Sequence, residues 1–292
     1  MGSIKRYYPN SFTYPTVLFY GLFFIFPSLV GLGFAFTNWG SENLANWGAI
    51  KFIGFDNFKY LFDDADFNAA LNNTFVFAAV TTFLKILLGL LLALGLNQRL
   101  VTRNFLRAVY YIPAVVSVTA IGLLFSAIFS MDGLFNHLLR FLGFDDLAIN
   151  WLGDTRTAFS IVMSMEVWKW SGFCMMIFLA GLQAISKEYY EASNIDGASR
   201  LQQFRHITFP LLMPAITINV TLNLIGGFKV FDQVYVLTNG RSGTEVLNTQ
   251  VYRAFSNGLY GRSSAMGMIL FLIIAAITLI VVSYLKRKEV DY

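Results

Sequence analysis

Charged side chains stand inside apolar stretches of this sequence, at spacings that suit ion pairing. Glu166 and Lys169 are three residues apart in one stretch, and Lys229 and Asp232 repeat that spacing in the next. Residues three apart on a helix share a face, so each pair can form an ion pair. A charge at the bilayer centre costs about 2.5–3.5 kcal/mol on insertion scales and usually faces a cavity or a counter-charge. Each pair therefore either closes helix packing or borders a polar pathway, and the spacing leaves both open.

The stretch that holds Lys229 also carries many amide and hydroxyl groups. These are Asn219, Thr221 and Asn223, followed by Gly226 and Gly227. Buried polar groups need hydrogen-bond partners, which a hydroxyl-rich solute supplies, and small residues let a backbone or a ligand approach closely. We expect these polar residues to face an interior pathway. Lys85, in an earlier apolar stretch, is expected to have a structural role, either snorkelling or pairing between helices.

Motifs for catalysis by the chain itself are missing from the sequence. It has no G-x-x-x-x-G-K-[ST] loop for phosphates, no H-E-x-x-H and no G-x-S-x-G. Its one cysteine, Cys174, and its two distant histidines, His137 and His206, form neither a disulfide nor a metal cluster. We therefore expect no enzyme activity, no metal and no cofactor in this chain.

The elements that must position these side chains are membrane-spanning helices. The chain has 292 residues, of which 56% are hydrophobic and 13% charged, whereas soluble proteins average about 45–50% and about 25%. A bilayer core needs roughly 20 apolar helical residues, and six stretches suffice. They are Val17–Phe36, Thr74–Leu96, Phe105–Phe129, Ala158–Leu182, Leu211–Leu237 and Ala265–Leu285. We expect a single transmembrane domain over residues 1–292.

The basic residues set the expected orientation, because Lys and Arg are enriched in cytoplasmic loops. One set of segments holds eleven of them: Lys5, Arg6, Arg99, Arg103, Arg107, Lys187, Arg200, Arg205, Lys286, Arg287 and Lys288. The opposite set holds seven, over longer loops: Lys51, Lys59, Arg140, Arg156, Arg241, Arg253 and Arg262. Both termini are thus expected to be cytoplasmic, and the first stretch is expected to be a retained anchor. The net charge of +4 follows from topology, and no nucleic-acid partner is expected.

The loop at residues 183–210 is predicted to form two short cytoplasmic helices. Ser186 can cap a first helix through Ile195, and Gly197 supplies a stop, since glycine tolerates the positive φ common just past a helix end. Ser199 with Gln202 fits a capping box for a second helix. Leu201, Phe204 and Ile207 give that second helix an apolar stripe. Nothing within the loop can cover this stripe, so a partner or the span ends must do so.

The same loop resembles the E-A-A-x-x-x-G-x9-I-x-L-P pattern of the integral membrane permeases of binding-protein-dependent ABC importers, in their sugar and oligosaccharide branch. It matches the pattern at Glu191, Ala192, Gly197, Ile207 and Pro210. Ser193 and Phe209 stand where the pattern has Ala and Leu. Further similar stretches are Gly54–Phe58, Tyr111–Pro113, Phe228–Asp232 and Leu237–Gly240. The resemblance covers nearly the whole chain.

The resemblance implies the all-α integral membrane fold of a type I ABC importer permease, with six transmembrane helices and a cytoplasmic coupling helix. It implies a second related permease, two cytoplasmic ATPase subunits that bind ATP and Mg²⁺, and an extracytoplasmic solute-binding protein. In such a complex, in a prokaryotic cytoplasmic membrane, the loop helix docks on the ATPase. Glu191 is then expected to make a polar contact with the ATPase, and Gly197 to allow the turn.

The resemblance also implies a sugar site in the middle of the membrane, lined by the fourth and fifth spans. Those spans offer Trp168, Trp170, Phe173, Asn223, Gly227, Phe228, Lys229 and Asp232. The aromatic residues can instead serve helix packing, which is their commoner role. Which sugar is carried stays open, from a monosaccharide to an oligosaccharide or a polyol phosphate.

Two other functions stay open on the residues alone. An ion-coupled secondary carrier would use the intramembrane charges Glu166, Lys169, Lys229 and Asp232, and a membrane scaffold would transport nothing. The loop helices, likewise, can lie at the membrane surface without a partner. The spaced loop motif favours the ATP-driven importer over these alternatives.

Overall fold

Helices account for nearly all regular structure in this protein. The computed structural model describes residues 13–98 and 100–289, so Lys5, Arg6 and Arg99 of the topology count lie outside the described residues. Within these ranges, extended pairing is limited to an isolated bridge between Thr37 and Phe52. The all-α class expected from the sequence is confirmed.

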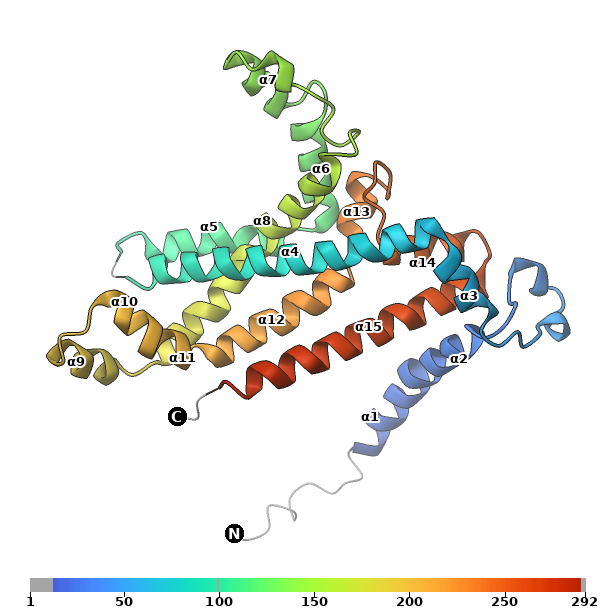
Figure 1. Ribbon diagram of the computed structural model, residues 1–292, viewed down its shortest axis with the longest axis horizontal. Coiled ribbons are helices and arrows are strands. Elements are labelled where there is room, and N and C mark those ends of the chain that lie inside the picture. Colours follow the sequence, from blue (N-terminus) through green and yellow to red (C-terminus); the bar gives the residue numbers. More distant parts are fainter. Residues whose placement is uncertain (1–12, 99, 290–292) are drawn as a thin grey trace, which may run out of the picture. The chain divides into compact units, whose positions relative to one another are not determined.

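Fifteen α-helices follow one another along the described chain (Figure 1). The first eight are α1 (Thr13–Tyr20), α2 (Phe26–Phe34), α3 (Asp56–Asp63), α4 (Ala65–Leu96), α5 (Arg103–Val115), α6 (Val118–Phe129), α7 (Leu134–Phe141) and α8 (Ala158–Ala184). The others are α9 (Lys187–Ile195), α10 (Arg200–Gln203), α11 (Phe209–Leu211), α12 (Met213–Phe228), α13 (Asp232–Leu237), α14 (Leu247–Ser256) and α15 (Tyr260–Lys286).

Five helical segments in the described residues are long and apolar enough to cross a membrane. They are Thr13–Phe34, Ala65–Leu96, Val118–Phe141, Ala158–Ala184 and Tyr260–Lys286. A sixth crossing is counted if Arg200–Leu211 and Met213–Phe228, which meet at a 63° bend, form one span. Every one of the six expected spans thus overlaps a candidate crossing.

By their contacts the helices divide into two compact units. One contains the described residues before Asn68 together with Gln250–Phe271, and the other contains Asn68–Thr249 with the described residues from Leu272 onward. In the first unit, Asn57 Nδ2 donates to the carbonyl oxygens of Ala35 and Thr37 and so ties α3 to the end of α2. The prediction of one transmembrane domain over residues 1–292 stays a prediction.

Two apolar clusters lie along α4 and α8 in the second unit. One contains Phe77, Ile121, Val162, Met165, Val230, Val234, Leu237 and Val246. The other contains Ala93, Leu96, Met175, Phe178, Leu179, Leu182, Leu212 and Ala215. Helix α8 contributes to both clusters and packs against α5 and α12, so it is the central element of this unit.

The continuous helix expected over Phe105–Phe129 is divided, and that expectation is wrong. The backbone turns extended at Val116 and Ser117, with ψ of 143° and 145°. Pro113 lies in the last turn of α5, and the Ser117 hydroxyl accepts a hydrogen bond from the Ala120 amide at 3.2 Å, which caps α6. A serine that satisfies the amides of a new helix makes a break here favourable.

The expected span over Leu211–Leu237 is divided as well. Helix α12 ends at Phe228, and α13 begins at Asp232 after a short non-helical segment, Lys229–Phe231. The break places Lys229 and Asp232 in and just after an irregular segment instead of on one helix face. The i,i+3 pairing expected for them therefore does not form, and no ion pair joins them among the described residues.

Candidate functional site

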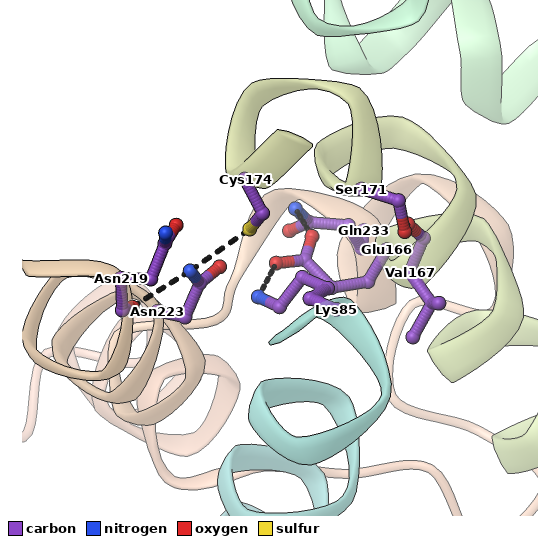
Figure 2. Close-up of polar contacts among 8 residues, drawn as sticks. All are labelled: Lys85, Glu166, Val167, Ser171, Cys174, Asn219, Asn223 and Gln233. Carbon is purple, nitrogen blue, oxygen red and sulfur yellow. Dashed lines mark hydrogen bonds and ion pairs between the residues drawn. The ribbon is translucent and has the colours of Figure 1, made fainter. Parts of the chain in front are cut away.

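A buried polar cluster joins three elements of the second unit between its two apolar clusters. Lys85 of α4 and Glu166 of α8 form an ion pair, with Nζ 2.8 Å from Oε1. Gln233 of α13 donates from Nε2 to the other carboxylate oxygen, Oε2, so the two oxygens hold different elements (Figure 2). Lys85 and Glu166 are 1% and 4% exposed. Both carboxylate oxygens thus have a partner, which offsets part of the cost of burying the charge.

Lys169 does not pair with Glu166, which corrects the possibility raised by their spacing. Its ammonium donates to the carbonyl oxygens of Pro113 at 2.9 Å and Ala114 at 3.3 Å, and also to that of Val116. These carbonyls lie at the carboxyl end of α5, where a helix leaves acceptors without intrahelical donors. Lys169 therefore caps a neighbouring helix, while Glu166 pairs with Lys85.

A pocket of about 340 Å³, lined by both apolar and polar side chains, opens beside the cluster. Its lining comes from α4, α8, α12, the break after α12 and α13: Lys85, Glu166, Trp170, Phe173, Leu222, Asn223, Gly226, Lys229, Val230, Phe231, Asp232 and Gln233. Ligand pockets of about 300–1,000 Å³, mostly apolar with a few convergent polar groups, are typical of small-molecule sites. This pocket combines aromatic rings, an amide and charged groups of both signs.

Five of the eight residues predicted for the substrate pathway line this pocket. They are Trp170, Phe173, Asn223, Lys229 and Asp232. Trp170 and Phe173 meet edge to face, with ring centroids 5.9 Å apart. The Asn223 amide donates to the Asn219 carbonyl oxygen at 2.8 Å and to Cys174 Sγ at 3.1 Å (Figure 2), so its position is fixed by both α12 and α8.

The other three predicted pathway residues lie outside the pocket. Gly227 faces α4, where an added Cβ would lie 2.8 Å from Ala78 Cα, and buried Phe228 meets Phe75 edge to face. Trp168 is 47% exposed and lines a separate apolar groove with residues of α4 and α5. Two residues correspond to about 200° around a helix, so Trp168 and Trp170 project from different faces of α8.

Sequence reasoning left open that Glu166 borders the pathway, but it missed Gln233 and the pairing of Glu166 with Lys85. Lys85 was expected to be structural, and its pairing between helices is confirmed. Gln233 carried no signal, because an uncharged residue beside Asp232 suggests no partner. Lys85 and Glu166 are 81 residues apart in sequence, a separation that no periodicity argument bridges.

The loop at residues 183–210 forms the two predicted helices. Ser186 Oγ accepts from the Glu188 amide at 3.3 Å and caps α9. Gly197 has φ of +75°, in the left-handed region that favours glycine. The Ser199–Gln202 capping box is complete, with bonds of 2.7 and 3.4 Å. Beyond α10 the chain continues through a π-helical turn, Phe204–Thr208, into α11.

Polar contacts hold the two loop helices together. Gln203 Nε2 donates to Ser193 Oγ at 3.0 Å and to Asn194 Oδ1 at 2.6 Å, and the hydroxyls of Tyr190 and Thr208 are 3.0 Å apart. Ser193, the departure from the second Ala of the motif, is thus used in the fold of the loop. The loop is a preformed unit rather than a flexible connector.

The motif residues of the loop differ in exposure. Glu191 and Ala192 are exposed on α9, whereas Ile207 and Pro210 are partly buried near the start of α12. Ile195 at the end of α9 is 88% exposed, and Leu201 on α10 is 76% exposed. An acidic side chain beside exposed apolar groups suits a protein partner better than water.

Comparison with known proteins gives the same picture. The family model described as "Binding-protein-dependent transport system inner membrane component" matches residues 85–289. The probable ABC transporter permease YurN of Bacillus subtilis strain 168 is 35% identical over 279 residues, covering 91% of this chain and 96% of YurN. AraP of the same organism, an arabinooligosaccharide transport system permease, is 34% identical over 283 residues, covering 94% and 88%.

A solved structure shares the fold as well. It is a bacterial ABC transporter for import of the acidic polysaccharide alginate, with a TM-score of 0.82 and 26% identity over 95% of this chain and 94% of that one. The family model, the relatives and the shared fold agree with the resemblance that the loop motif carries. The chain is an integral membrane protein that belongs to the inner membrane component family of binding-protein-dependent transport systems.

Proposed function

We propose that this chain is the permease subunit of an ABC importer for a sugar or oligosaccharide, delivered by an extracytoplasmic solute-binding protein. The observation that carries the substrate class is the pocket of about 340 Å³, where Trp170 and Phe173 lie near Asn223, Lys229 and Asp232. Aromatic rings stack on the apolar face of a pyranose, while amides and charged groups bond its hydroxyls. The arabinooligosaccharide and alginate systems among its relatives support this class.

ATP hydrolysis is assigned to two partner subunits that bind ATP and Mg²⁺, because the sequence contains no phosphate-binding loop. The exposed face of α9, with Glu191 and Ala192, is proposed as the ATPase contact. Gly197, Ile207 and Pro210 would support that contact by shaping the turn and the start of α12. A second, related permease would complete the translocation pathway.

The position of α12 offers a direct mechanical route from partner to pocket. The loop helices precede it and α13 follows it, at its opposite end (Figure 1). Its 16 residues span about 24 Å at 1.5 Å per residue, and Asn223 and Gly226 in its second half line the pocket. Movement of α9 by a closing ATPase would therefore displace one pocket wall and open the site to alternate sides.

This function requires the loop to face the cytosol, with both termini on the same side. The distribution of Lys and Arg supports that orientation. Single cysteines placed in the loop at Ala192 and in the opposite segment at Glu42, in a Cys174→Ser background, should differ in labelling. An impermeant maleimide added outside intact cells should modify position 42 and spare position 192.

The main test is uptake by a reconstituted complex. Proteoliposomes with this chain, its partner permease, the ATPases and the binding protein should accumulate labelled sugar, blocked by vanadate and indifferent to an uncoupler. Trp170→Ala should reduce sugar binding, and Trp168→Ala should reduce it far less, since Trp168 lies outside the pocket. Uptake by this chain alone would overturn the proposal.

An ion-coupled carrier is the alternative that a specific observation favours. The buried Lys85–Glu166 pair resembles the charged sites through which carriers bind ions. That function predicts the reverse pattern of inhibition, with uptake abolished by an uncoupler and unaffected by vanadate. The loop motif and the family favour the ATP-driven importer.

A further inference from the structure

Two kinds of bond meet on the Glu166 carboxylate. The bond from Lys85 is an ion pair between α4 and α8, and the bond from Gln233 is a hydrogen bond from a neutral amide on α13. Breaking the first leaves two unpaired charges in an apolar interior, which is strongly unfavourable. Breaking the second leaves the ion pair intact. The carboxylate thus belongs to an α4–α8 frame, to which the Gln233 amide attaches α13.

The Gln233 bond adds a directional contact to the apolar packing of α13. Val234 and Leu237 of α13 are buried in the apolar cluster with Phe77 and Met165, but apolar burial is non-directional. A hydrogen bond weakens steeply as its angle departs from linear. The Gln233 amide therefore helps to fix the rotation of α13 about its own axis, together with the apolar side chains that hold α13 in the cluster.

The rotation of α13 decides what the pocket presents. Asp232 immediately precedes Gln233 on the first turn of α13, and the irregular segment Lys229–Phe231 leads into it. All of these residues line the pocket. Asp232 lies about 100° around the helix from Gln233. With Gln233 directed at Glu166, Asp232 is directed elsewhere and is exposed rather than buried.

We propose that Gln233 is a positioning residue for the substrate site. Through its bond to Glu166 it orients the pocket wall formed by Lys229–Asp232. This inference rests on the proposed function, because it assigns Gln233 to the sugar site. It predicts that loss of the amide weakens solute binding without unfolding the protein.

The test compares Gln233→Leu, Gln233→Asn and the matched control Gln250→Leu in the purified complex. Leu is close in size and donates no hydrogen bond, and Asn keeps the amide on a side chain one methylene shorter. Gln250 is as buried as Gln233, at 9% exposure each, and lies outside the pocket. The probe is whichever of arabinobiose, maltose or an alginate disaccharide the wild-type complex takes up best.

Equilibrium dialysis should show the dissociation constant for that probe raised about tenfold in Gln233→Leu and by a smaller factor in Gln233→Asn. The melting temperature should fall by no more than the loss of one buried hydrogen bond explains, the maximal uptake rate should stay near wild type, and Gln250→Leu should bind normally. Binding by Gln233→Leu within twofold of wild type, or equal losses in Gln250→Leu, overturns the proposal. If both Gln233 variants fail to fold, the role is merely structural and the proposal is wrong. Absence of uptake by the wild-type complex would instead refute the proposed function.

Discussion

The loop at residues 183–210 and the buried cluster of Lys85, Glu166 and Gln233 are both polar, yet they are built by opposite means. Every stabilising bond of the loop joins residues at most 18 apart, from the Ser199–Gln202 box to the Tyr190–Thr208 contact. The cluster joins residues 81 and 67 apart. The loop presents Glu191 and Ala192 to solvent, whereas the cluster is almost wholly buried.

This difference implies that substitutions in a local polar structure and in a long-range one destabilise the protein to different extents. When an exposed side chain in the loop loses its partner, water can replace that partner. Substitution there should therefore change function more than stability. A buried charge cannot be rehydrated without unfolding, so loss of Lys85 or Glu166 should change stability first. The following predictions test that contrast, in order of their expected effect on the stability of the chain.

The largest loss of stability is expected for Lys85→Met. The methionine fills similar space but leaves the Glu166 carboxylate buried without its counter-charge, which costs about 3–5 kcal/mol. We expect little monodisperse protein in size-exclusion chromatography of the solubilised chain. The double variant Lys85→Met/Glu166→Gln, which removes both charges, should recover most of the yield.

A surface pair gives the control for this first prediction. Lys59 and Asp56 form an ion pair of 3.3 Å with side chains 75% and 65% exposed, and such pairs contribute about 0–1 kcal/mol. Lys59→Met should therefore leave yield and melting temperature unchanged. Equal losses for the Lys59 and Lys85 variants would contradict the role of burial.

A smaller loss is expected for Lys169→Met. It leaves the carbonyl oxygens at the end of α5 without their ammonium donor, and an unsatisfied buried acceptor costs about 1–3 kcal/mol. A cycle of Lys169→Met and Glu166→Gln, read by melting temperature, should show weaker coupling than a cycle of Lys85→Met and Glu166→Gln, because Lys169 and Glu166 form no ion pair. Equally strong coupling in the two cycles would instead support the Glu166–Lys169 ion pair that the spacing suggested.

Gly197→Ala should cost about 1–2 kcal/mol, the penalty for an L-residue in the left-handed region. No atom lies within 4 Å of the added Cβ, so the effect is conformational and confined to the turn between α9 and α10. Gly95→Ala is a suitable control, since Gly95 is helical and equally open. Thermal unfolding of the two variants should show a loss for position 197 and none for position 95.

Glu191→Lys should leave stability unchanged and abolish coupling. Its side chain is exposed, so reversal of its charge costs the fold little, while a partner surface that accepts the carboxylate would reject an ammonium. Affinity purification should recover the Glu191→Lys variant without the ATPase. The control Glu42→Lys, an exposed change outside the loop, should be recovered together with the ATPase. Copurification of the ATPase with Glu191→Lys would show that this residue is not in the contact.

More of the loop than of the buried cluster could be predicted from the sequence, for a physical reason. Caps, the glycine turn and the helix bounds of the loop depend on neighbours within a few residues, so Ser186, Gly197 and Ser199 could be assigned from the chain alone. Helix breaks were harder to predict from the sequence. The divisions at Val116–Ser117 and Lys229–Phe231 replace apolar helix that composition alone would continue.

The sequence by itself determined that the protein is helical and membrane-embedded, and that its loop carries a motif of the permease family. Those properties follow from the length of apolar runs and from short-range capping. Only the tertiary structure decided that Glu166 pairs with Lys85 rather than Lys169, that Gln233 joins them, and that Trp170 rather than Trp168 faces the pocket. Such choices depend on how α4, α8 and α13 are rotated against one another, because the apolar packing that sets these rotations involves residues far apart in the chain.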